Sequence, residues 1–235
     1  MKRFVHKLTI FCIALLCATA VQADDFEDGV AAYNRQDYAT ALPKFRSAAQ
    51  QGSAEAQFNL GLIYSKGQGV AQDYAEAVRW YKLAAAQGDA EAQLNLGFMY
   101  DNGQGVTQDY AEAVRWYKPA AAQGNAKAQS NLALRLENGQ GVAQDYAEAV
   151  RWYRLAAAQG NVIAQVNLGV KHGTGKGVLE NYVKAHMWYN LAAVGGDATA
   201  VKNRDIVAAK MTPQQIAEAQ KLARECQARN FKNCD

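Results

Sequence analysis

The side chains best suited to chemistry in this sequence are its histidines and its recurring carboxylates. Beyond the first 23 residues the histidines are His172 and His186, and we interpret both as core or surface residues. The sequence contains no Gly-x-Ser-x-Gly, no His-Glu-x-x-His and no serine three residues before a lysine, which excludes common nucleophile and zinc motifs. Carboxylates such as Asp73 and Glu76 stand where they can cap helices. We therefore expect no enzyme activity, no cofactor and no metal.

The first 23 residues are typical of a signal peptide. A basic start through Lys7 precedes an apolar run from Leu8 to Cys17, which is too short to span a membrane, and small residues lead to Ala23. We expect cleavage after Ala23, with Ala20 as the second choice. A lipid-anchored form through Cys17 is disfavoured because the preceding Leu16 is not small. The sequence thus predicts an exported protein, in the periplasm or alternatively secreted, without a transmembrane segment in the mature chain.

Cleavage there would leave two cysteines, Cys226 and Cys234, close together near the C-terminus. Two thiols in an exported protein predict one disulfide. A loop this short would be stabilised by about 2 to 3 kcal/mol on the chain-entropy model. Two sulfurs without a nearby histidine are too few ligands for a metal site.

The charges give no sign of a nucleic-acid partner. The sequence has 25 Lys and Arg against 22 Asp and Glu, and Lys2, Arg3 and Lys7 lie in the first 23 residues, which contain no acidic residue. The remaining chain therefore has 22 charges of each sign, and they do not cluster. Because nucleic-acid binding draws on clustered positive charge, we expect no nucleic-acid partner.

The rest of the sequence repeats itself every 36 residues, which indicates a stacked array of small structural units. Glycine-valine pairs and tryptophans both keep this period. The positions are Gly69-Val70, Gly105-Val106, Gly141-Val142 and Gly177-Val178, and Trp80, Trp116, Trp152 and Trp188.

Each repeat is predicted to form two helices. The first helix carries Ala-x-x-x-Leu-Gly-x-x-Tyr, as in residues 56–64, and the second carries Asp-Tyr-Ala-Glu-Ala-Val-Arg-Trp-Tyr, as in residues 73–81. Apolar residues recur at three- and four-residue spacing in both. We expect Asp73 to cap the second helix, Glu76 to bond back to Asp73, and the intervening Gly-x-Gly-Val to turn with positive φ while its valine enters the core.

Two prolines interrupt this pattern. Pro43 and Pro119 fall inside predicted second helices. An interior proline costs about 3 kcal/mol and removes a hydrogen bond. We expect a bend or an early end of the helix at each.

These motifs resemble the Sel-one-like repeats (SLR), relatives of tetratricopeptide repeats, over nearly all of residues 25–210. The resemblance implies an all-α fold, a right-handed superhelical solenoid of antiparallel helix pairs whose first helices line the concave side. It also implies a scaffold or adaptor for other proteins, an inference by analogy.

We expect three segments in the chain. Residues 1–23 form the signal peptide, and residues 24–210 form the solenoid of about five helix pairs plus a polar capping helix. Residues 211–235 form a C-terminal capping helix, begun by Thr212, Pro213 and Gln215, and a disulfide-closed tail.

A row of asparagines is the candidate binding site. Asn59, Asn95, Asn131, Asn167 and, in a drifted context, Asn203 share one position of the first helix, which faces the groove in tetratricopeptide-type stacking. An amide both donates and accepts, so the row could pair with the backbone of an extended peptide. Alternatively, each Asn bonds a neighbouring helix and sets the stacking register.

Apolar residues accompany this row on the same face. They would form an exposed binding strip, or alternatively pack against one another. They are Phe58, Leu62, Leu94, Phe98, Leu134, Val166 and Val170. Four glutamines also recur, without an assigned role: Gln57, Gln93, Gln129 and Gln165.

The predicted function is an exported repeat scaffold that binds a protein or peptide partner through its concave groove. One alternative is binding of cell-wall glycan. Another is the weak β-lactam or peptidoglycan-directed activity described for cysteine-rich relatives, whose cysteine pair in each repeat this chain lacks. Buried tryptophans would favour the protein groove, and exposed ones would favour a sugar.

Overall fold

The computed structural model describes residues 25–234, so the predicted signal peptide and its cleavage site lie outside the described residues. The described secondary structure is entirely helical, as predicted. The described residues divide into two compact units, one up to Gln108 and one from Asp109 onward.

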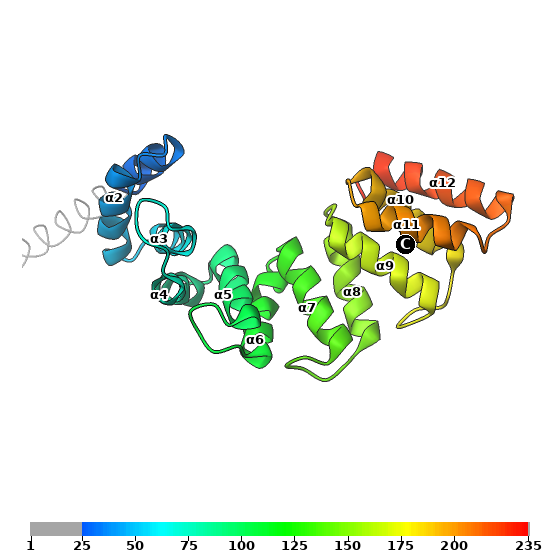
Figure 1. The fold of residues 1–235 in the computed structure, drawn as a ribbon, viewed down its shortest axis with the longest axis horizontal. Coiled ribbons are helices and arrows are strands. Elements are labelled where there is room, and N and C mark those ends of the chain that lie inside the picture. Colours follow the sequence, from blue (N-terminus) through cyan, green and yellow to red (C-terminus); the bar gives the residue numbers. More distant parts are fainter. Residues whose placement is uncertain (1–24, 235) are drawn as a thin grey trace, which may run out of the picture. The chain divides into compact units, whose positions relative to one another are not determined.

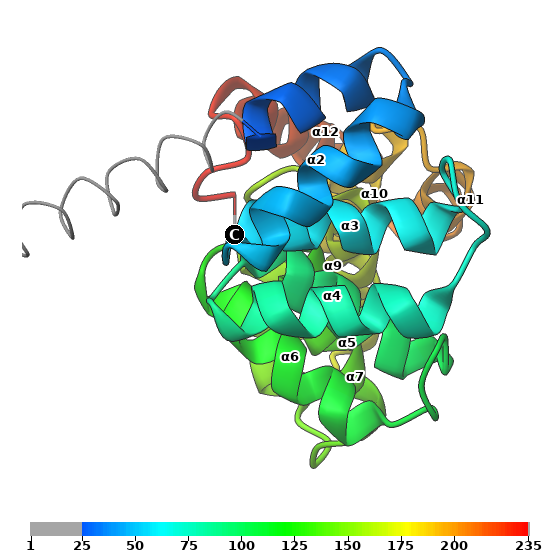
Figure 2. The same cartoon turned by 90° about the vertical axis from the view of Figure 1, so that its left-hand side faces the viewer.

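The first unit is a succession of helices in which neighbours along the chain pack against each other (Figure 1). It begins with a helix over residues 25–34. The helices that follow are α2 (Tyr38–Gln50), α3 (Ala54–Lys66), α4 (Tyr74–Ala86) and α5 (Ala90–Asn102). Figure 2 shows α3 and α4 lying side by side.

The second unit continues the same alternation and ends in two helices outside the regular pattern. α10 is central here, because it packs against α9, α11 and α12. The helices are α6 (Tyr110–Ala122), α7 (Ala126–Asn138), α8 (Tyr146–Ala157), α9 (Val162–Thr174), α10 (Tyr182–Val194), α11 (Ala198–Ala208) and α12 (Pro213–Ala228).

Salt bridges attach the helix over residues 25–34 to α2. The Nζ atom of Lys44 lies 2.8 Å from Asp25 and 2.9 Å from Asp28, and the hydroxyl of Ser47 donates to Asp25. These bonds from Lys44 and Ser47 lower the pKa of the Asp25 carboxyl. Polar contacts thus add to the apolar core in closing this end of the unit.

Second helices start at the predicted aspartate, but one predicted bond is wrong. The side chain of Asp73 accepts from the backbone N–H of Glu76. Glu76 does not bond back to Asp73, because the backbone N–H of Asp73 donates to the carbonyl of Tyr64 at 3.0 Å. The Glu76 carboxylate instead accepts from Arg79. The start of α4 is thereby tied to the last turn of α3, across the loop.

The Gly-x-Gly-Val loop of each repeat lies in close contact with the second helix of the preceding repeat. Gly69 has a φ of 71°, and a Cβ there would lie 2.4 Å from the Cβ of Tyr38. A Cβ on Gly105 would lie 2.3 Å from the backbone carbon of Tyr74. Only glycine permits both the positive φ and this approach. Val70 packs against the core, as predicted.

Small residues and tyrosines build the core. Tyr81 is buried, and a Cβ on Gly61 of α3 would lie 2.4 Å from its ring. The alanines at 77, 84 and 85 are buried too, which lets neighbouring helices approach closely. Burial raises the pKa of Tyr81 to about 12, and a hydrogen bond with Ser65 partly opposes this.

Of the bend or early end predicted at each proline, the early end is wrong. α2 continues beyond Pro43 to Gln50, and α6 continues beyond Pro119 to Ala122, so both helices have 13 residues, as α4 does. Ala48 and Ala49 after Pro43, and Ala120 and Ala121 after Pro119, are buried. Packing of these last turns outweighs the single backbone hydrogen bond that each proline removes.

The C-terminal helix begins as predicted. The Thr212 hydroxyl accepts from the backbone N–H of Gln215, whose side chain accepts from the backbone N–H of Thr212, with Pro213 in the first turn. Ala219 and Ala223 are buried on the face of α12. α12 packs against α10.

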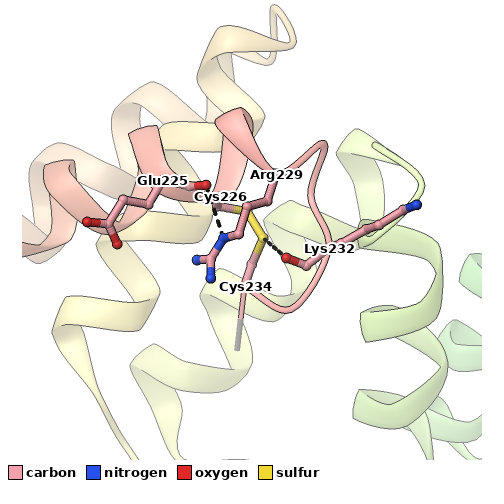
Figure 3. Close-up of a disulfide and its surroundings, with 5 residues drawn as sticks. All are labelled: Glu225, Cys226, Arg229, Lys232 and Cys234. Atoms are coloured by element: carbon pink, nitrogen blue, oxygen red, sulfur yellow. Dashed lines mark hydrogen bonds between the residues drawn. A yellow bond between two sulfur atoms is a disulfide. The ribbon is translucent and has the colours of Figure 1, made fainter.

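A disulfide joins Cys226, near the end of α12, to Cys234 in the tail, as the sequence predicts. Figure 3 shows the tail curling back to the helix, with the Nε atom of Arg229 donating to the carbonyl of Glu225. Cys226 is completely buried. The disulfide therefore anchors the tail to the core of the second unit.

Candidate functional site

In the first unit, the predicted asparagines lie partly exposed on the first helices of two repeats. Asn59 lies on α3 and Asn95 on α5. Each Nδ2 atom donates to the backbone carbonyl four residues earlier, Glu55 or Glu91, at 2.8 Å. The asparagines are therefore held by their own helices, an arrangement that neither sequence interpretation anticipated.

The apolar neighbours of these asparagines differ in exposure. Phe98 is 46% exposed, and Leu62 is half-buried. Phe58 is half-buried and packs against Tyr81, with ring centroids 6.0 Å apart. Leu94 is only 7% exposed, so it belongs to the core. The prediction that all of these apolar residues form an exposed strip is therefore wrong for Leu94. Phe98 is thus the main apolar contact that this face offers.

The second unit has asparagines at the equivalent positions of α7 and α9. Asn131 and Asn167 are partly exposed, and Leu134 is half-buried between solvent and core. Val166 and Val170 pack against the buried cluster around Tyr189, so they serve the core as well as the surface.

A further member of this face lies on α11. Asn203 is partly exposed, and Ile206, three residues later, is 53% exposed. Sequence reasoning missed Ile206, although its 36-residue spacing from Val170 could have identified it.

The recurring glutamines have a structural role. The buried Nε2 atom of Gln57 donates to the carbonyl of Ala49 at 3.1 Å, and its Oε1 accepts from Gln87 at 2.8 Å. Gln129 likewise donates to Ala121 and accepts from Gln159. Each such glutamine satisfies a carbonyl at the end of one second helix and bonds to the next second helix, so it joins consecutive repeats.

A buried charge cluster in the second unit was not predicted. Lys171 of α9 forms an ion pair with Glu137 of α7, and the Tyr153 hydroxyl donates to the same carboxylate at 3.1 Å. Burial, and secondarily the charge of Glu137, raises the pKa of Tyr153. Lys171 is only 1% exposed, so the ion pair lies inside the stack of helices and not on its surface.

The histidines do not form a recognisable chemical site. His172 and His186 are both buried. Burial, followed by the charge of Arg204, lowers the pKa of His186. Among residues 25–234, no group of three or more His, Cys, Asp or Glu side chains is arranged to hold a metal ion.

The tryptophans differ in burial. Trp188 is buried, whereas Trp80, Trp116 and Trp152 are half-buried, and none is fully exposed. Three of the four therefore meet neither the buried condition predicted for a protein groove nor the exposed condition predicted for a sugar surface.

The repeats of this chain match a family of known proteins. The Sel1 repeat family matches residues 54–89, 90–125, 126–161 and 162–197. The chain belongs to the Sel1 repeat family, a family of repeat scaffolds, as its motifs predict. The match is narrower than the resemblance expected over residues 25–210, because the first helix pair has a shorter loop and α11 has lost the Leu-Gly motif.

Solved structures agree with this assignment. A Sel1 repeat protein from Oxalobacter formigenes is 32% identical with a TM-score of 0.69, over 86% of this chain and 75% of that one. A protective antigen of uropathogenic Escherichia coli strains with an SLR fold is 29% identical with a TM-score of 0.62, over 92% of this chain and 56% of that one. A sel1 repeat protein from Klebsiella pneumoniae subsp. pneumoniae shares the fold, at 22% identity and a TM-score of 0.50, over 81% of this chain and 95% of that one.

No match was found among curated proteins. In the described part of the chain, no helix has the length and apolar character needed to cross a membrane.

Proposed function

We propose that the protein is an exported scaffold that binds an extended segment of a partner protein on the face of its first helices. In the first unit the residues that make the contact are the partly exposed asparagines Asn59 and Asn95, with Phe98 and Leu62 beside them. The second unit offers Asn131 and Asn167 at the equivalent positions of its own first helices. Phe58 and Leu94 support this face from beneath.

One observation carries the proposal. The side chains of Asn59 and Asn95 each use a single N–H to bond their own helix, and neither side chain makes another hydrogen bond within the described residues. An amide has two donors and an acceptor with two lone pairs. The second N–H and the oxygen are therefore positioned, by a rigid helix, to pair with the backbone of a bound peptide.

The face also has the composition of a peptide-binding surface. Backbone pairing provides affinity without regard to the peptide sequence, and apolar positions beside it select side chains. Phe98 is an aromatic residue next to this polar row, and aromatic residues contribute strongly to protein interfaces. Glycan binding is less well supported, because Trp188 is buried and the other three tryptophans are half-buried, so none offers a fully exposed ring.

Export is supported by two features. The order of basic, apolar and small residues in 1–23 is that of a signal peptide. The disulfide between Cys226 and Cys234 suits an oxidising compartment. We place the protein in the periplasm, with secretion as the alternative.

The test is a pull-down from envelope extract with the mature protein and two triple variants. The first changes Asn59, Asn95 and Asn131 to Ala. The matched control changes the exposed arginines Arg79, Arg115 and Arg151 of the second helices to Ala. We expect the control to retain a partner that the folded asparagine variant loses, and equal retention by both variants would refute the proposed site.

A further inference from the structure

An exposed glutamate lies one helical turn before each asparagine of the first unit. Glu55 precedes Asn59 on α3, and Glu91 precedes Asn95 on α5. Residues four apart share one face of a helix. The backbone carbonyl of each glutamate also accepts the hydrogen bond from its asparagine. The carboxylates therefore belong to the same surface as the asparagines.

An apolar side chain completes the stripe on each helix. Leu62 follows Asn59 by three residues, and Phe98 follows Asn95 by three residues. Because α3 and α5 are in contact, the two stripes are neighbours in the first unit. Each presents a carboxylate, an amide and an apolar group in the same order.

The end of this face that carries the glutamates is negatively charged. The preceding second helices, α2 and α4, have no basic residue in their last turns, and Asp89 caps α5 with a further carboxylate. Lys66 of α3 lies eleven residues after Glu55, which is about 16 Å along the helix. That separation exceeds the screening length of about 8 Å at physiological salt.

The helices do not need these glutamates in order to form. An acidic residue in the first turn favours a helix, but Lys127 occupies the equivalent position of α7, and Ile163 that of α9. Both helices nevertheless have 13 residues, as α3 and α5 do. The acidic face is therefore a property of the first unit and not of the repeat.

We propose that the first-helix face of the first unit selects a basic segment, whose lysine or arginine side chains pair with Glu55 and Glu91. This inference rests on the proposed function, in which Asn59 and Asn95 bind the backbone of that segment. Complementary charge gives specificity and faster association. Phe98 offers an aromatic ring to the cation or the apolar stem of the same side chains.

The test measures the binding of three fluorescein-labelled peptides to the mature protein by fluorescence anisotropy. The peptides are four copies of Lys-Val-Thr, of Gln-Val-Thr or of Glu-Val-Thr, so they differ only in the charged position. The site variant combines Glu55→Gln with Glu91→Gln. The matched control combines Glu218→Gln with Glu225→Gln on α12, where both residues are exposed, and it changes the net charge equally.

We expect the lysine peptide to bind at least about tenfold more tightly than the glutamate peptide, because attraction is replaced by repulsion. The site variant should weaken binding of the lysine peptide about fivefold, as two exposed pairs would, and the control variant should not. The inference is overturned if the lysine peptide binds no more tightly than the glutamate peptide, or if both variants weaken it equally.

A third variant, Asn59→Ala with Asn95→Ala, separates this inference from the proposed function. If it abolishes binding of all three peptides and they bind equally to the original chain, the peptide face stands and its preference for basic segments is wrong. If the lysine peptide depends on Glu55 and Glu91 but not on the asparagines, the basic preference is supported and the proposed role of the asparagines is wrong.

Discussion

Lys171 and Glu137 form an ion pair between α9 and α7 in which the lysine side chain is only 1% exposed. In the repeats of the first unit the position equivalent to Lys171 is occupied by Ile63 and Met99. A charged residue therefore stands where those repeats have an apolar one. A buried charge is tolerated only when it is paired and hydrogen-bonded. The pair is therefore specific to the second unit, and it depends on both partners.

Removing one partner is expected to be costly. Glu137→Gln leaves the Lys171 charge buried without its carboxylate and should lower the free energy of unfolding by about 3 kcal/mol. Adding Lys171→Met should recover most of this loss, because Met99 fits the same repeat position. Urea unfolding measures both.

Arg79→Gln is the control for this experiment. It breaks the pair between exposed Arg79 and Glu76 and should change the free energy of unfolding by less than about 0.5 kcal/mol. A Glu137→Gln variant as stable as this control would contradict the structural importance of the buried pair.

His186 should make the fold sensitive to mild acid. Its pKa is lowered from 6.5 in the folded protein by burial and by Arg204, so the unfolded chain takes up a proton first as the pH falls. This difference reduces stability below about pH 6.5 and has no effect at higher pH, where both states are neutral.

His186→Val should remove this contribution, because Val78, Val114 and Val150 fill the same position in earlier repeats. The measurement is the Tm of both proteins at about pH 7.5 and about pH 5.5, on either side of the ordinary histidine pKa. The Tm of the variant should fall less on acidification. An equal fall in both proteins would rule out His186 as the cause.

Substitution by alanine should have opposite effects on stability at two glycines of α9. A Cβ on Gly169 would lie 2.5 Å from the ring of Tyr189, and such overpacking costs about 1 to 3 kcal/mol. A Cβ on Gly173 would lie 3.7 Å from the Cβ of Ala185, an ordinary contact. Gly173→Ala should therefore stabilise the helix by up to about 1 kcal/mol, as thermal unfolding would show. Similar effects at both sites would disprove the close Gly169–Tyr189 packing.

Two glutamines at equivalent positions should also differ. Gln129→Met removes two hydrogen bonds, one to the carbonyl of Ala121 and one from the amide of Gln159, and should cost about 1 to 3 kcal/mol in total. The Nε2 atom of Gln165 is buried without a hydrogen-bond partner among the described residues, so Gln165→Met should cost little or stabilise the protein. Denaturant unfolding of the two variants checks this, and the reverse ranking would be inconsistent with the bonding described.

The periodic features were predictable because repetition shows them many times over. Gly105, Asp73 and the tryptophan positions each have a local physical role that recurs in every repeat. Features that depend on competition between contacts were not predictable. The spacing alone could not show that the Asn59 side chain would bond its own helix, or that α6 would continue beyond Pro119. It also could not show that the backbone N–H of Asp73 would donate to the carbonyl of Tyr64 and not to the side chain of Glu76.

The buried ion pair left a signal that could have been used. Lys171 lies 36 residues after Arg135 and 72 after Met99. An alignment of the repeats would therefore have shown that Lys171 stands at a position that is apolar in the first unit. Its partner was harder to identify, because Glu137 sits where other repeats have Ser65, Asp101 or Gly173.

The most direct test of the proposed function compares photo-crosslinking from two equally exposed positions on opposite kinds of helix. Phe98 on the first helix α5 is 46% exposed, and Leu83 on the second helix α4 is 50% exposed. A benzoylphenylalanine at each position would be irradiated in envelope extract, in the original chain and with Asn59 and Asn95 changed to Ala. Peptide binding on the first-helix face predicts a partner crosslinked from position 98 and not from position 83, and lost in the asparagine variant. Crosslinking from position 83 alone, or from position 98 regardless of the asparagines, would contradict it.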